Sequence, residues 1–154
     1  MIVESAVVQL ARRFQTLTLS REEWTHRAHL AVGLWHVANF GPAEALERLR
    51  IGIRALNERN GVANTATGGY HETITRAYVL LLESFLARRR SSDSGDDCDL
   101  QNHFDALIHD PLIERTALLA HWTRERLHSS QARAEWLEPD LAPLTIATPV
   151  RPVR

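Results

Sequence analysis

Hydrophobic residues recur every three or four positions along most of the chain. In the segment 2–17 they stand at Val3, Val7, Leu10 and Phe14, a spacing that places them on one face of a helix. The same period is found in five further segments: 21–40, 43–60, 69–89, 100–108 and 111–127. No segment alternates convincingly at every second residue, as a half-buried strand would. The pattern therefore predicts an all-α fold.

Polar residues, glycines and prolines mark the expected ends of these helices. Ser20 and Glu23 have the spacing of a capping box, so we expect the second helix to begin near Arg21. Gly41-Pro42 should end that helix and start the next, and Gly61 should end the third. Together the signals predict one domain over 1–154, a bundle of about five or six helices. The tail over 139–154 holds four prolines and is expected to be extended.

Composition and charge exclude several classes of protein. The formal net charge of −1 argues against a nucleic-acid partner bound through bulk positive charge. The single cysteine, Cys98, permits no intramolecular disulfide. No run of 18 apolar residues is present, and residues 1–5 do not open a signal peptide, so we expect no membrane partner and a cytoplasmic location.

Histidines supply the candidate chemistry. A step of 100° per residue places His26 and His29 on or beside the inward face of the helix over 21–40. On the same wheel Trp24 falls opposite the histidines, where it is expected to pack on a neighbouring helix or on a second subunit, which is compatible with a homodimer. His71 opens the inward stripe of the helix over 69–89, and His36 forms a separate layer.

Two histidines three residues apart and a third from another helix could hold one divalent metal ion. Three nitrogen ligands with open positions are typical of catalytic metal sites, and Zn, Fe or Ni would suit them. The alternative is that each histidine is a buried residue satisfied by its own hydrogen bond. Glu23-x-x-His26 matches half of a di-iron motif, but a second Glu-x-x-His is absent.

Other side chains near the histidines have candidate roles. Glu72 or Glu22 could orient a metal-bound water or act as general base, although Glu72 in a first helical turn also suits the helix dipole. Candidates for contacts to a small-molecule substrate are Tyr70, Thr75, Arg27, Arg76 and Arg133.

The motifs also carry a resemblance. The segments WTHRAHL at 24–30 and GYHETIT at 69–75, with Asn64-Thr65 and residues 129–144, resemble a family of small, largely uncharacterised bacterial proteins. The resemblance covers about 14–144 and implies that the two histidine segments lie together. The architecture is also similar to the DinB-like metal-binding bundles, in which three intervening residues separate the histidine pair; here there are two.

Two functions of different classes follow from these residues. The first is a metal-dependent enzyme that uses His26, His29 and His71 on a small molecule, with hydrolysis or hydration favoured over oxygen-dependent chemistry. The second is a non-catalytic helical module that binds a ligand or a protein and whose histidines are hydrogen-bonded within the fold. A histidine pH switch is a third hypothesis.

Overall fold

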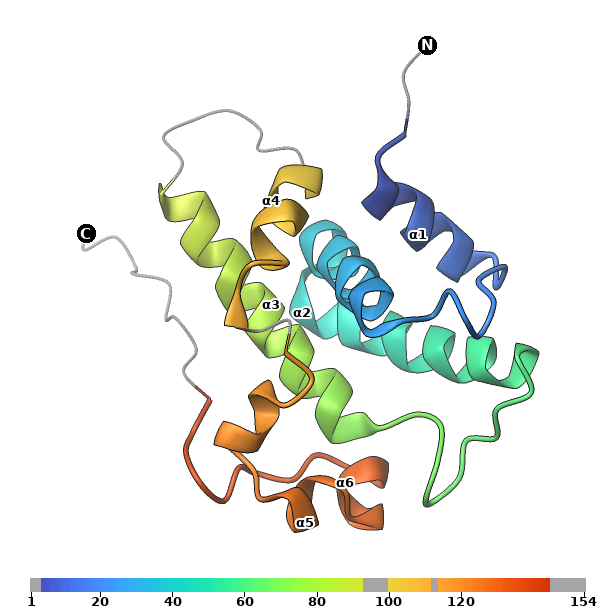
Figure 1. Ribbon diagram of the computed structural model, residues 1–154, viewed down its shortest axis with the longest axis vertical. Helices are drawn as coiled ribbons and strands as arrows, with labels where there is room; N and C mark the ends of the chain where they lie inside the picture. Colours follow the sequence, from blue (N-terminus) through green and yellow to red (C-terminus); the bar gives the residue numbers. More distant parts are fainter. Residues whose placement is uncertain (1–3, 93–99, 112–113, 145–154) are drawn as a thin grey trace.

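The computed structural model describes residues 4–92, 100–111 and 114–144, and the regular elements of these ranges are helices (Figure 1). This confirms the predicted all-α class. In chain order they are α1 (Ala6–Gln15), α2 (His26–Arg59), α3 (Glu72–Ser92), α4 (Leu100–Leu107), a 3₁₀ helix (Ala117–Ala120), α5 (Arg124–Leu127) and α6 (Ser130–Ala134). Cys98 and the last ten residues of the predicted tail lie outside the described residues.

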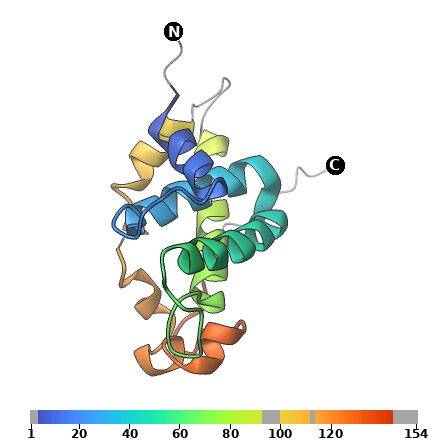
Figure 2. The ribbon, with the colours of Figure 1, turned by 90° about the vertical axis from the view of Figure 1, so that its right-hand side faces the viewer.

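Helix α2 consists of two helical halves joined at Gly41. This glycine has φ 76° and ψ 167°, which is not helical, and Pro42 follows it. The predicted break at Gly41-Pro42 is therefore confirmed. The two halves run in clearly different directions (Figures 1 and 2).

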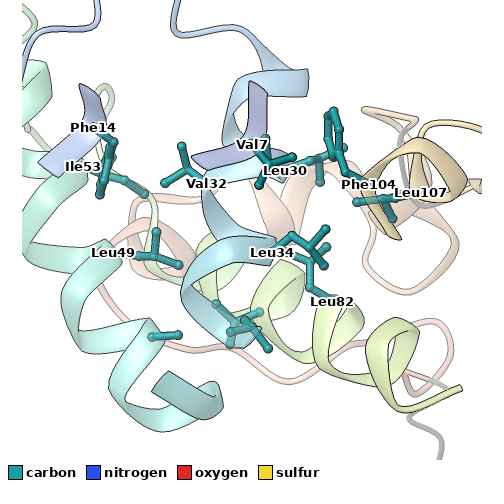
Figure 3. Packing of buried hydrophobic residues seen from close by; sticks show 14 of the residues in the cluster. Val7, Phe14, Leu30, Val32, Leu34, Leu49, Ile53, Leu82, Phe104 and Leu107 are labelled. Atoms are coloured by element: carbon teal, nitrogen blue, oxygen red, sulfur yellow. The ribbon is translucent and has the colours of Figure 1, made fainter. Parts of the chain in front are cut away.

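The main core lies between α2 and α3 and is covered by α1 and α4 (Figure 3). Leu34 on α2 and Leu82 on α3 are almost completely buried. The helices approach closely because Gly33 has no side chain: a Cβ there would lie 2.8 Å from Leu82 Cδ1. The ring of Phe14 packs over Gly52 in the same way, which fastens α1 to the second half of α2.

A second cluster packs on another face of α3. It joins Ala77 and Leu81 to Leu118, Trp122 and Leu127 of the C-terminal segment. The Trp122 indole is fully buried and its Nε1 donates a hydrogen bond of 2.9 Å to the Leu137 carbonyl. Figure 2 shows α5 and α6 beside the first turns of α3. Helix α3 is thus buried on two faces, by the α1–α2–α4 unit and by residues 114–144.

The prediction of one helix over 111–127 is wrong. The structure has a turn, the 3₁₀ helix and then α5, separated at Thr123. Thr123 caps α5 by accepting from Arg126 N, and Asp140 accepts hydrogen bonds from its backbone N–H (2.8 Å) and its hydroxyl (2.7 Å). Such local side-chain bonds compete with a continuous helix. The apolar residues Leu118, Leu119, Trp122 and Leu127 still reach one cluster without a continuous helix.

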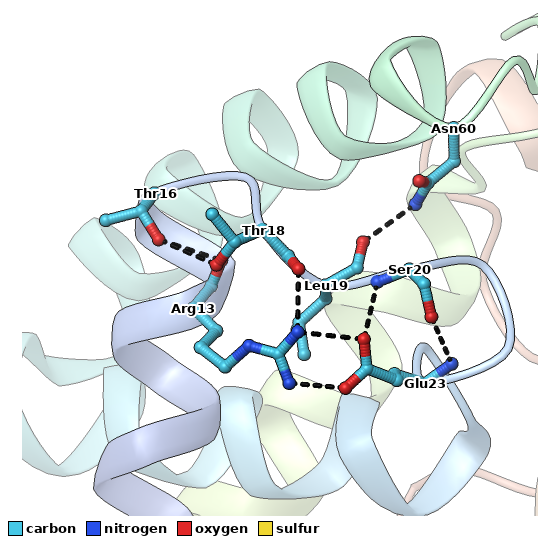
Figure 4. A network of polar contacts seen from close by, with 7 residues as sticks. All are labelled: Arg13, Thr16, Thr18, Leu19, Ser20, Glu23 and Asn60. Atoms are coloured by element: carbon cyan, nitrogen blue, oxygen red, sulfur yellow. Dashed lines mark hydrogen bonds and ion pairs between the residues drawn. The ribbon is translucent and has the colours of Figure 1, made fainter.

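The predicted start of the second helix is also wrong. Ser20 and Glu23 do form the reciprocal capping-box hydrogen bonds, at 3.0 and 3.2 Å, but they close an isolated turn. Arg13 of α1 pairs with the Glu23 carboxylate and stabilises that turn (Figure 4). The N-cap of α2 is Thr25, whose hydroxyl accepts from Ala28 N at 3.2 Å. Trp24 therefore precedes the helix instead of lying on it.

Candidate functional site

Two adjoining cavities lie where the segments 24–30 and 69–75 meet. The first has a volume of about 320 Å³ and its wall is mainly apolar. The second, of about 420 Å³, reaches toward the start of α3. Five residues line both: Trp24, His29, Ile53, Ile74 and Thr75. Residues of both histidine segments line these cavities, so the two segments adjoin in the structure.

Trp24 forms a wall of both cavities. Its ring stacks on His29, with centroids 3.7 Å apart, and on Phe14 at 5.3 Å. The expectation that Trp24 lies opposite the histidines is wrong, because the wheel placed Trp24 inside a helix that in fact begins at His26. The buried Trp24 Nε1 has no hydrogen-bond partner among the described residues.

His29 is a neutral imidazole with one fixed tautomer. Its Nδ1 lies 2.7 Å from the Thr25 carbonyl, which can only accept, so Nδ1 carries the proton and Nε2 keeps a lone pair. Burial among protein atoms lowers the pKa of His29 to about 4. The side chain nevertheless remains accessible to solvent, because both cavities open onto it. His29 is thus surrounded by protein atoms on its Trp24 side but exposed where it lines the cavities, within reach of a small molecule.

His26 lines the first cavity and contacts Tyr78. The two rings meet edge to face, with centroids 5.6 Å apart. Burial raises the pKa of Tyr78 to about 12, and its hydroxyl donates to the Glu114 carbonyl at 3.2 Å. Tyr78 therefore links α3 to the C-terminal segment at the edge of the cavity.

His71 uses both ring nitrogens within the fold. Its Nδ1 accepts from the backbone N–H of Ile74 at 3.2 Å, and its Nε2 lies 2.7 Å from the Leu127 carbonyl. The first bond resembles an N-cap of α3, and the second ties that end of α3 to α5. Since Nδ1 accepts, the ring is neutral with its proton on Nε2, and burial lowers its pKa.

The predicted metal ligands thus have separate hydrogen bonds in this structure. His29 and His71 bind carbonyls of different segments. Among the described residues, no group of three or more His, Cys, Asp or Glu side chains is arranged to hold a metal ion. A three-histidine metal site remains a prediction that metal analysis must decide.

Glu72 is held in a charged network that joins α2 to α3. Arg50 donates to both of its oxygens, at 2.8 and 2.7 Å, and the Tyr70 hydroxyl donates at 2.7 Å. The Arg50 hydrogen bonds lower the pKa of Glu72, while burial and the bond to Glu72 raise that of Tyr70. The carboxylate lines neither cavity. This engagement gives Glu72 a structural role, and a general-base role stays untested.

The remaining predicted site residues divide into two groups. Tyr70 and Thr75 line the second cavity, and Thr75 lines the first as well. Glu22, Arg27 and Arg76 are exposed and line neither; the Arg76 guanidinium lies 4.7 Å over the Trp136 ring. Of the predicted substrate-binding residues in these groups, Tyr70 and Thr75 therefore lie at the cavities, and Arg27 and Arg76 do not.

Arg133 lines neither of these two cavities and instead forms a structural contact. It donates to the carbonyls of Gly69 and Tyr70, at 2.8 and 3.3 Å. This fixes the backbone that leads into His71 and α3.

Two arginines that the sequence patterns did not indicate also lie on the cavity walls. Arg115 lines the first cavity from the turn before the 3₁₀ helix, and Arg21 lines the second. No local pattern identifies them, because each lies in a turn whose position is set by contacts with distant parts of the chain.

These features define a helical protein with a two-part cavity between its main helices. None of the helices in the described ranges is long and apolar enough to cross a membrane. Comparisons with protein-family models, with curated proteins and with solved structures give no match. The function must therefore be argued from the site itself.

Proposed function

We propose that this chain is a non-catalytic helical binding protein that holds a small, largely apolar molecule between α2 and α3. The observation that carries the proposal is the first cavity, about 320 Å³ in volume, lined by apolar side chains and a few polar ones. Cavities of this size and lining are typical of small-molecule sites.

The wall of the cavity is already built in this structure. The Trp24–His29 stack, the His26–Tyr78 contact and the turn closed by Arg13 and Glu23 hold the polar rim in one arrangement. A ligand that enters a preformed site loses less free energy to the ordering of side chains. This favours binding without a large rearrangement of the fold.

The hydrogen bonds of the histidines favour binding over metal catalysis. A metal ion held by His71 would have to displace either the Ile74 N–H or the Leu127 carbonyl from the ring. Loss of the first bond would remove the cap of α3, and loss of the second would weaken the contact between α3 and α5. The metal-dependent enzyme remains the competing hypothesis.

Fluorescence titration with N-phenyl-1-naphthylamine, a neutral apolar probe, tests the proposal. Thr75 lines both cavities, so we expect Thr75→Phe to fill them and to weaken probe binding at least about tenfold. Leu80→Phe, on the same helix but lining neither cavity, is the matched control and should bind as the unchanged protein does. Equal binding by all three proteins would refute the proposed site.

Metal analysis separates the two hypotheses. Protein purified without an affinity tag or chelator should contain far less than one equivalent of Zn, Fe or Ni per chain. About one equivalent, lost in His29→Ala, would favour the enzyme and overturn the present proposal.

A further inference from the structure

The charged side chains that line the two cavities are positive. The ionisable side chains that line them are arginines, histidines and tyrosines: Arg21, His26, His29, Tyr70, His71, Tyr78 and Arg115. No aspartate or glutamate among the described residues lines either one. A cleft with low-dielectric walls and charge of one sign attracts ligands of the other sign. The lining favours an anion and disfavours a cation.

Arg115 is the cation of the first cavity. Among the described residues no carboxylate forms an ion pair with it, whereas Arg13 and Arg50 each pair with a glutamate. Its charge also reaches His29: burial is the main cause of the lowered pKa of that imidazole, and the charges of His26 and, to a smaller extent, Arg115 lower it further. A guanidinium beside an apolar wall is well suited to bind a carboxylate through two parallel hydrogen bonds.

His29 fixes the orientation of such a ligand. Because Nδ1 donates to Thr25, the Nε2 lone pair of the neutral ring would repel a carboxylate. The anionic group is therefore expected at Arg115, and the flat Trp24–His29 pair is left to contact an apolar body. The volume of about 320 Å³ is roughly twice that of the ~150 Å³ cavity known to hold benzene, which suits a body of about two rings.

We propose that the first cavity takes an aromatic carboxylate, with its ring system against Trp24 and its carboxylate on the Arg115 guanidinium. This inference rests on the proposed binding function and adds the chemical class of the ligand. It places the specificity of the site in a residue of the C-terminal segment, outside both histidine motifs.

Isothermal titration calorimetry with three probes of one shape tests the inference. They are 2-naphthoate, neutral 2-naphthamide and 2-naphthylmethylammonium. We expect naphthoate to bind at least about tenfold more tightly than the amide, as one charge-assisted hydrogen-bonded pair allows. The ammonium probe should bind most weakly. Added salt should reduce the preference, since Arg115 is exposed.

Two variants test whether the carboxylate of the probe binds at Arg115. Arg115→Gln should lower the affinity for naphthoate to that for the amide and leave amide binding unchanged, which shows that the cavity is intact. Arg124→Gln, also exposed and lining neither of the two cavities, should change the affinity for neither probe. Thermal unfolding of both variants checks that the fold is retained.

Each outcome separates the inference from the function on which it rests. Equal binding of naphthoate and amide by the unchanged protein would overturn the inference and keep the proposed function. A preference that survives Arg115→Gln would overturn the assigned contact. Binding of none of the three probes would overturn both.

Discussion

The backbone at Gly69 offers the sharpest test of how the second histidine segment is positioned. Gly69 has φ +79°, and a Cβ there would lie 2.6 Å from the Ala63 carbonyl oxygen and 2.6 Å from Asn64 Oδ1. Neither atom can move easily, because Asn64 Oδ1 accepts from Tyr70 N and from the Asn57 amide, both at 3.0 Å. Gly69→Ala should therefore combine backbone strain with a steric clash.

Gly61 provides a matched control for this substitution. It has φ +75°, but a Cβ there would meet nothing within 4 Å. Gly61→Ala should cost only the left-handed backbone penalty, about 1 kcal/mol. Gly69→Ala should cost that amount and a further ~2 kcal/mol for overpacking. For a chain of this size the difference corresponds to a fall in Tm of about 4–8 °C.

Chemical denaturation of the three proteins measures both costs. The free energy of unfolding comes from urea titrations analysed with a common slope, and calorimetry gives the Tm values. Gly69 also lines the second cavity, so Gly69→Ala should in addition weaken binding there. Equal destabilisation by the two substitutions would refute the argument that the Ala63–Asn64 contact fixes this segment.

Three further predictions concern the charged network, the histidines and the α2 cap. Glu72→Gln should lower the free energy of unfolding by about 2 kcal/mol, since it breaks a partly buried pair with Arg50, whereas Glu44→Gln, in an exposed pair with Arg48, should cost under about 0.5 kcal/mol; equal losses in urea titrations would contradict this. In the folded protein the pKa of His29 is about 4 and that of His71 is lowered, whereas the unfolded value is about 6.5. The unfolded chain therefore binds more protons in this range. The free energy of unfolding should fall as pH drops from about 6.5 toward 4. Urea midpoints across that range should show the fall, with a smaller slope in His29→Gln; an unchanged slope would exclude His29 as a source. Thr25→Ala should cost about 1 kcal/mol through loss of the α2 cap, and Ser20→Ala should cost less, because its turn caps no helix; a larger loss for Ser20→Ala would contradict the assigned start of α2.

Much of the fold follows from local sequence patterns. The apolar period and the Gly41-Pro42 break predicted the main helices, since both depend on neighbouring residues. The start of α2 was missed because the Ser20–Glu23 box forms correctly but is held by Arg13 from another helix. The helix over 111–127 was missed because Asp140, 17 residues away, fixes Thr123 as a cap.

The chemistry of the site did not follow from histidine spacing. His26 lines the first cavity, His71 the second and the exposed His29 both. The direction of each ring depends on contacts that no spacing encodes, such as the bond from His71 to the Leu127 carbonyl. Arg115 could not be found at all, because it reaches the cavity from a turn whose position depends on the second cluster and on the hydrogen bond from Tyr78 to the Glu114 carbonyl.

Burial of α3 on two faces has a consequence for folding. The first cluster contains Phe14 and contacts Trp24, and the second contains Trp122 with Trp136 packed against it. Neither cluster can be completed unless α3 is in place, so the two halves of the molecule should unfold in a single cooperative transition. An amide near Trp24 and one near Trp122 should then exchange their hydrogens with the same global protection.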